Sequence, residues 1–202
     1  MTQSFNFSDV PEWNNGSGQT GTNSIDRKNL FISDIQPNKW RLQIERVPRP
    51  MWGINLRSII PDRWNEIARL CYRAEGYRCS ICYGSGLESG RKHPVEAHEV
   101  WAYDDLTHVQ SLIGIQALCP ACHRCKHPGM SEAEGYDHTV HIHLMKVNGC
   151  TRKEAIEYCQ ESLSVAKHRS RFPWTLDISK LEEILQELEQ KTGRNYAPPE
   201  SR

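Results

Sequence analysis

Four of the eight cysteines in this 202-residue chain form two pairs, Cys79-Ser-Ile-Cys82 and Cys119-Pro-Ala-Cys122. Two residues between thiolates allow a tight turn to point both sulfurs at one ion, and two such pairs supply the four ligands of a tetrahedral zinc site. Because four thiolates leave no open coordination position, the spacing predicts a structural zinc ion and not a catalytic one. Cys125 follows Cys122 by the same step and is the rival ligand.

Three histidines lie close to these pairs in the sequence. His98 falls between the two pairs, and His123 and His127 follow the start of the second pair. Pro120 suits the first turn of a helix, on which His123 and His127 share one face. Cys122 and His123 are neighbours and therefore about 100° apart around that helix. The helix can offer its cysteines to one metal ion and its histidines to another site.

The segments before this helix have the lengths and compositions of strands. Residues 111–118 form an apolar run, and residues 95–101 precede it with polar and apolar side chains in turn. The predicted order is strand, loop, strand, helix, with the polar ligands on the first strand and on the helix.

The order Cys-x-x-Cys, Glu-x-His, Leu-Cys-x-x-Cys-His over residues 77–128 resembles the zinc-finger-bearing HNH endonucleases. The active unit of that family is a ββα-metal motif. The resemblance implies one divalent ion (Mg²⁺, Mn²⁺, Ni²⁺ or Zn²⁺) that contacts the scissile phosphate, and a neighbouring base that activates water. The fold class expected from it is α+β, with a zinc-stabilised ββα-metal core and helical flanking segments.

The resemblance also implies roles for individual residues. In Glu96-Ala97-His98-Glu99, His98 takes the position of a metal ligand and Glu99 the position of the base. His123 matches the final histidine of the family pattern, and His127 matches a further ligand found in some members. In the alternative register His98 is the base, which leaves Ala97 where a ligand belongs.

Two positions depart from the family pattern. Glu99 is a carboxylate where an imidazole is usual, although a carboxylate near a metal can accept a proton. Gly114 stands where the family commonly has an asparagine, and neither Gln110 nor Gln116 is in register to replace it.

Three functions are compatible with these residues. The first is a metal-dependent endonuclease that hydrolyses phosphodiester bonds in DNA. The second is a catalytically inactive zinc-bearing module that binds nucleic acid or protein, which the departures at Glu99 and Gly114 favour. The third is a nuclease-like protein that acts on RNA or small nucleotides.

The charge composition limits the kind of nucleic-acid contact. The 25 Lys and Arg residues balance 25 Asp and Glu residues, which argues against a polybasic coat. Residues 39–78 nevertheless hold nine basic against four acidic residues, a local net charge of +5. No apolar run approaches the roughly 20 residues of a membrane span, and the first residues lack a secretory signal pattern. We therefore expect a cytoplasmic protein without a membrane partner.

The chain divides into four predicted regions. Residues 1–29 are rich in Gly, Asn, Ser and Thr, which predicts a flexible tail. Residues 30–76 predict an extension with a strand over 40–47 and a basic helix from Pro61. Residues 77–130 predict the zinc-bound core. Residues 131–195 predict helices. These span Tyr136–Val147, Thr151 to about His168 after a capping box, and Ser179 to a stop at Gly193. His138, His141 and His143 are interpreted as ordinary helix residues, and Asp104-Asp105 as a turn.

Overall fold

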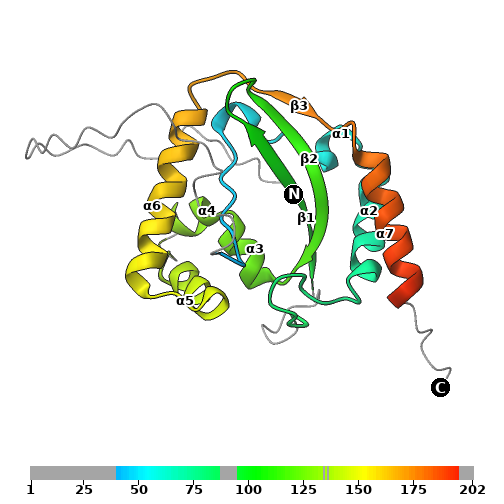
Figure 1. The fold of residues 1–202 in the computed structure, drawn as a ribbon, viewed down its shortest axis with the longest axis horizontal. Coiled ribbons are helices and arrows are strands. Elements are labelled where there is room, and N and C mark those ends of the chain that lie inside the picture. Colours follow the sequence, from blue (N-terminus) through cyan, green and yellow to red (C-terminus); the bar gives the residue numbers. More distant parts are fainter. Residues whose placement is uncertain (1–39, 87–94, 134, 136, 196–202) are drawn as a thin grey trace, which may run out of the picture. The chain divides into compact units, whose positions relative to one another are not determined.

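A computed structural model describes residues 40–86, 95–133, 135 and 137–195, which all belong to one unit of the chain. The predicted tail over residues 1–29 lies outside the described residues. The chain is of mixed α+β class, as expected, with helices on both sides of a three-stranded sheet (Figure 1).

The segment over residues 40–47 is not the strand that its alternating pattern predicted. The Leu42 N–H donates to Asn148 Oδ1 over 2.8 Å, and the Leu42 carbonyl accepts from Asn148 Nδ2 over 3.1 Å. The Glu45 N–H donates to the Lys126 carbonyl over 2.8 Å. Side chains and a helix end thus satisfy this backbone, where a strand would need a neighbouring strand. We call residues 40–48 the strap.

After the strap, the chain forms a short 3-10 turn, η3 (Arg49–Met51), and two helices, α1 (Leu56–Ile59) and α2 (Pro61–Ala74). The prediction of α2 is confirmed. Proline occupies its first turn, and Gly76, at φ 57°, follows its end. The buried residues of α2 include the predicted stripe of Trp64, Ile67, Ala68 and Cys71.

The sheet consists of β1 (Glu96–Asp104), β2 (Val109–Leu118) and β3 (Thr175–Asp177), in the order β1-β2-β3. β1 and β2 are antiparallel, with His98 opposite Gln116, and the register shifts between Val100 and Trp101. β3 pairs in parallel with β2 over three residues. So short a strand has no periodicity of its own, and the sequence did not reveal it.

Helix α3 (Pro120–Lys126) follows β2 directly, so that the predicted strand, loop, strand and helix are all present. The next helices are α4 (Pro128–Ala133), α5 (Asp137–Asn148), α6 (Arg152–Arg169) and α7 (Leu181–Asn195). The capping box of Thr151 and Glu154 starts α6 as predicted. Gly193 does not end α7, which continues to Asn195.

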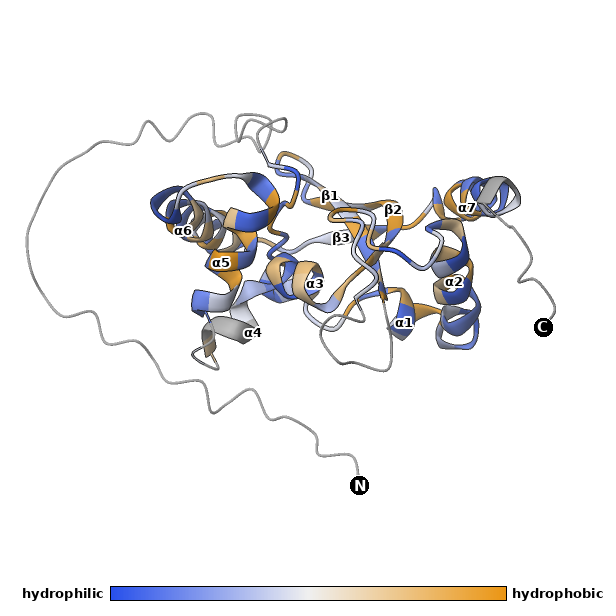
Figure 2. Cartoon of the chain, turned by 90° about the horizontal axis from the view of Figure 1, so that it is seen from below, coloured by the Kyte–Doolittle hydropathy of each residue, from blue (hydrophilic) through white to orange (hydrophobic). Residues whose placement is uncertain are grey.

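Two clusters of buried side chains hold these elements together. In the first, apolar residues of β1 and β2 pack against α2 and α7, whose apolar side is visible in Figure 2. In the second, Leu42 of the strap packs with the paired cysteines and with α3, α5 and α6. Ala97 and Trp101 of β1 belong to the first cluster, and Leu118 at the end of β2 belongs to the second.

A buried ion pair joins the end of α6 to the loop between β1 and β2. Arg169 is 3% exposed, and its Nε and Nη2 donate to the two carboxylate oxygens of Asp105 over 2.7 and 2.8 Å. Asp104 accepts from the N–H groups of Leu106 and Thr107. Asp105 lies in the turn as interpreted, whereas Asp104 is the last residue of β1, and neither carboxylate lies in a metal cluster of the described residues.

Within the described residues, no helix combines the length and the apolar character that crossing a lipid bilayer requires.

Asn148→Ala tests the attachment of the strap. The change leaves the N–H and C=O of fully buried Leu42 without partners, and we expect the free energy of unfolding to fall by about 1–3 kcal/mol. Urea unfolding measures this loss, with Lys146→Ala, an exposed change on the same helix, as the control. Equal stability of the two variants would show that these hydrogen bonds do not hold the strap.

Candidate metal centres

The structure brings together the two cysteine pairs that the sequence predicted as zinc ligands. The sulfurs of Cys79, Cys82, Cys119 and Cys122 all lie within 4.8 Å of one another, and the sulfurs of Cys82 and Cys119 are 3.6 Å apart. Two sulfurs each about 2.3 Å from one tetrahedral zinc ion are about 3.8 Å apart. The cluster is therefore the size of a four-thiolate site and can hold a structural metal ion.

Local hydrogen bonds place both pairs at the end of β2. The first pair lies in a tight turn, in which the Tyr83 N–H donates to the Cys79 carbonyl over 2.9 Å. The Ser80 N–H and hydroxyl both donate to the Ala117 carbonyl of β2. The second pair begins α3, where Cys119 is the residue before the first helical turn. One strand end thus positions all four sulfurs.

The electrostatics of the four sulfurs call for a cation. Hydrogen bonds from the thiols of Cys119 and Cys122 lower the pKa of Cys79, because they stabilise its thiolate. Hydrogen bonds with Cys119 and Cys79, followed by burial, raise the pKa of Cys122, and repulsion from the negative charge of a Cys79 thiolate adds to the shift. A divalent ion removes that repulsion and allows all four thiols to ionise.

Cys125, the rival ligand, does not join the cluster. Its thiol donates to the Val140 carbonyl over 3.7 Å, and burial raises its pKa to about 12. His143 of α5, by contrast, contacts the cluster, with Nε2 3.2 Å from the Cys122 sulfur. The sequence analysis treated His143 as an ordinary helix residue. Its position three residues after buried Val140 and next to buried Leu144 is the signal that places it on the inner face of α5.

The three histidines form a second cluster. One ring nitrogen from each of His98, His123 and His127 lies within 4.8 Å of the others. The ring centroids are 5.0–5.6 Å apart. His98 comes from β1, His123 lies within α3, and His127 is the residue that ends α3. Nitrogens about 2.0–2.1 Å from one zinc ion are at most about 4.2 Å apart, so the three rings could hold a metal ion after a small closure.

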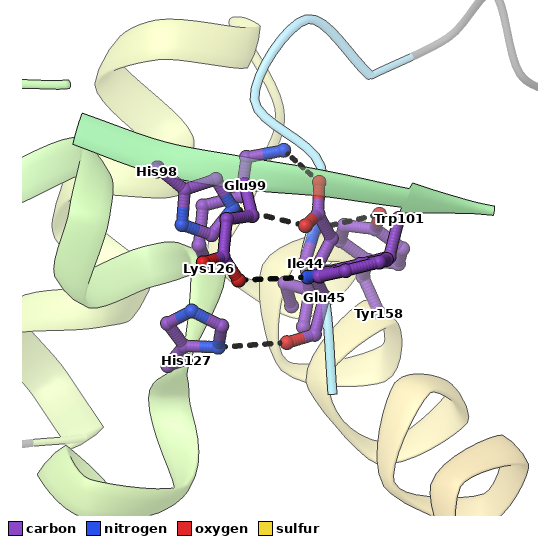
Figure 3. Close-up of polar contacts among 8 residues, drawn as sticks. All are labelled: Ile44, Glu45, His98, Glu99, Trp101, Lys126, His127 and Tyr158. Atoms are coloured by element: carbon purple, nitrogen blue, oxygen red, sulfur yellow. Dashed lines mark hydrogen bonds and ion pairs between the residues drawn. The ribbon is translucent and has the colours of Figure 1, made fainter. Parts of the chain in front are cut away.

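Each of these rings has one nitrogen bonded to an acceptor of the protein. His98 Nε2 donates to Glu45 Oε2 over 2.9 Å, and His127 Nδ1 donates to the Glu45 carbonyl oxygen over 3.0 Å (Figure 3). His123 Nδ1 donates to the Glu96 carboxylate. Metal-bound histidines commonly bond in this way, which fixes the tautomer and leaves the other nitrogen for the ion.

Glu45 of the strap contacts two of the histidines and was not predicted from the sequence as a residue of this site. Its carboxylate lies between His98 and Lys126, whose Nζ donates to Glu45 Oε1 over 2.5 Å (Figure 3). Burial by itself raises the pKa of Glu45, but hydrogen bonds and charge interactions with His98 and Lys126 outweigh burial and lower it. The side chain is therefore a carboxylate. Lys126 is only 4% exposed, so this ion pair is buried.

The histidines suit metal binding because they are neutral. Burial lowers the pKa of His127 to about 4, and the neighbouring His98 and His123 add to the shift. Burial also lowers the pKa of His98, although Glu45 opposes that shift. A histidine ligand must present a neutral ring nitrogen, so these two rings meet the requirement at pH 7.

Solvent reaches the cluster from one side. The side chains of His123 and Glu96 are 29% and 40% exposed, whereas His98 is 4% exposed. An ion held by the three rings is buried on the side of the strap and accessible beside His123 and Glu96.

Glu99 does not lie at the cluster, which corrects its assignment as the base beside the ion. It follows His98 on β1 and points to the opposite face. Its Oε1 accepts from the Leu56 N–H over 2.7 Å, and its Oε2 accepts from Trp101 Nε1 over 3.2 Å. Burial raises the pKa of Glu99 despite these bonds. The carboxylate anchors α1 to the sheet.

The structure supplies no asparagine substitute at Gly114. A Cβ placed there would lie 3.8 Å from Val100 Cβ, so the position has room for a side chain but holds none. Gln116 lies opposite His98 in the sheet, although its sequence position does not match that of the family's asparagine. Gln110 is fully buried, and neither atom of its amide has a hydrogen-bond partner among the described residues.

Comparisons with protein-family models, curated proteins and solved structures found no match for this chain.

Cys79→Ser tests the four-cysteine site. We expect the purified protein to carry about one tightly held zinc ion, and the variant to lose that ion and unfold at lower temperature. Cys150→Ser is the matched control, because Cys150 lies outside the cluster. Elemental analysis and thermal unfolding measure both effects. A Cys79→Ser protein with unchanged zinc content and thermal midpoint would sink the assignment.

Glu45→Gln tests how the strap supports the histidines. The amide cannot accept from His98 and Lys126 as strongly, so we expect divalent-ion affinity at the histidine cluster to fall by about 10- to 100-fold. Calorimetric titration of zinc-loaded protein with a second divalent ion measures the affinity. Glu66→Gln, an exposed change on α2, is the control and should leave it unchanged. Equal affinity of the two variants would remove Glu45 from the centre.

Proposed function

We propose that this protein is a metal-dependent phosphodiesterase of the HNH type that cleaves nucleic acid, with DNA as the first substrate to test. The observation that carries the proposal is the cluster of His98, His123 and His127. In this cluster, β1 and α3 with the residue after it bring three rings together, and each ring has one nitrogen hydrogen-bonded to the protein. Three protein ligands leave a coordination position open, as in catalytic metal sites. The antiparallel β1 and β2 followed by α3 have the order of a ββα-metal motif.

A bound divalent ion would polarise a phosphate oxygen and lower the pKa of a coordinated water. The chain's own residues prepare the site for this chemistry. Glu45 holds His98 and His127 in fixed orientations, and the buried Lys126 balances the carboxylate charge. Substrate enters on the open side, beside His123 and Glu96.

The residue roles follow from burial and contacts. His98 is almost fully buried and bonded to Glu45, which favours the role of ligand over that of base. The base needs to reach water, and Glu96 is the carboxylate at the open side of the cluster. We assign proton acceptance to Glu96 in place of Glu99, whose two oxygens are bonded on the other face of the sheet.

A second candidate is a binding module without catalysis. Its support is that Glu99 is withdrawn from the cluster and that Gly114 offers no amide to the site. Such a protein would keep both clusters for stability and bind nucleic acid or protein. Activity toward RNA or small nucleotides is a third possibility that the neutral net charge leaves open.

His123→Ala tests the proposal. We expect wild-type protein with added Mg²⁺, Mn²⁺, Ni²⁺ or Zn²⁺ to nick supercoiled plasmid, and His123→Ala to lose at least about 100-fold in rate, with partial recovery at high metal concentration. His138→Ala is the matched control, because His138 is exposed on α5 and outside both clusters. Glu96→Gln should keep metal binding and lose roughly 10²–10⁴-fold in rate, while Glu99→Gln should mainly lower stability.

Single-stranded DNA, RNA and dinucleotides are tested in parallel with the plasmid. If wild-type protein cleaves none of them with any of the four ions, the catalytic proposal fails and the binding module is favoured.

A further inference from the structure

An exposed arginine–tyrosine stack lies beside the first cysteine pair. The Tyr83 side chain is 65% exposed, and the guanidinium carbon of Arg41 lies 4.7 Å from the centre of its ring. Arg78 Nη1 donates to the Tyr83 carbonyl over 3.2 Å, so a second cation is held at the same turn. Arg41 and Arg78 are themselves exposed. Neither the zinc cluster nor the histidine cluster uses this group.

The backbone at Tyr83 makes an aromatic residue there costly. Tyr83 has φ 60°, and its N–H closes the turn of the cysteine pair by donating to the Cys79 carbonyl. The turn therefore requires the left-handed region, which glycine enters freely and a bulky residue enters only with strain. The exposed ring gains little from burial to offset that strain. Tyr77 is exposed at a similar φ, so strain alone assigns no function, and the feature that distinguishes Tyr83 is the Arg41 guanidinium over its ring.

We propose that the stack of Arg41 and Tyr83, with Arg78, is a binding platform for an unpaired base and its flanking phosphates in single-stranded nucleic acid. Aromatic rings with nearby arginines bind single strands in this way, because every base has a face that stacks and every nucleotide carries a phosphate. Bases inside a duplex are already stacked on each other and cannot reach the ring. Single-stranded nucleic acid as a substrate rests on the proposed nuclease function, whereas binding of a single strand does not.

The strap connects the platform to the residue that supports the histidine cluster, because it carries both Arg41 and Glu45. Arg41 precedes Glu45 by four residues, so their Cα atoms are at most about 14 Å apart. At 3.4 Å per nucleotide along a strand, this distance spans about four nucleotides. Tyr83 also follows Cys82 directly, and Cys82 approaches α3 through Cys119. The proposal places a base on Tyr83 and a phosphate at the histidines in the same strand.

Tyr83→Gly separates this role from a structural one. We expect the variant to keep its zinc and to have a thermal midpoint no lower than that of the parent, because glycine relieves the backbone strain. We expect its affinity for a fluorescently labelled 12-nucleotide single strand to fall by about fivefold or more, which is the loss of one stacked base. Tyr83→Phe should retain the affinity. Fluorescence anisotropy measures binding to DNA and RNA strands and to a duplex of the same sequence.

The measurements use the His123→Ala background without added divalent ion, so that cleavage does not interfere. Tyr77→Gly is the matched control, since Tyr77 is also exposed at φ 57° and no arginine lies over its ring in the described part of the chain. An affinity unchanged in Tyr83→Gly, an equal loss in Tyr77→Gly, or a preference for the duplex would overturn the platform. Loss of binding in Tyr83→Gly together with an inactive wild-type protein would uphold the platform and reject the nuclease.

Discussion

The buried carboxylate of Glu45 is the interaction on which the site depends. It accepts from His98 and from Lys126, and the carbonyl of the same residue accepts from His127. One residue thus joins the strap to β1 and to the end of α3. Removing one partner of a buried ion pair typically costs about 3–5 kcal/mol, because the other charge is left uncompensated. The strap therefore supports the histidine cluster, and the geometry of the three rings depends on the strap as well as on the strand and the helix.

Helix α3 and the residues at its two ends contribute to both candidate metal sites. Cys119, the residue before the first turn of α3, and Cys122 belong to a closed set of four sulfurs, while His123 and His127 belong to an open set of three rings. A closed site fixes the helix on the end of β2, and an open site leaves room for water or a phosphate oxygen. Because adjacent residues of a helix point about 100° apart, Cys122 and His123 face different clusters, and α3 with the residue on either side of it carries members of both.

The sequence predicted what spacing alone determines. The paired cysteines, the helix that follows β2 and helices α2, α5 and α6 follow from local periodicity and turn chemistry, whereas His127 lies just past the end of α3 and not on the helix as predicted. It could not predict Glu45, because the contact with His98 joins residues 53 positions apart and the strap's alternation suggested a strand. Glu99 was placed beside the ion by its sequence position, although alternation along β1 sends it to the face that packs on α1 and α2. Three-residue β3 has too little pattern to detect.

We propose that one chain holds a closed thiolate site and a separate open histidine site. Anomalous X-ray diffraction from crystals grown with excess zinc, recorded on both sides of the zinc absorption edge, tests this directly. We expect two peaks per chain, one among the four sulfurs of the cysteine cluster and one among the ring nitrogens of His98, His123 and His127. A single peak at the cysteines, with the three rings lacking density between them at saturating zinc, would contradict it.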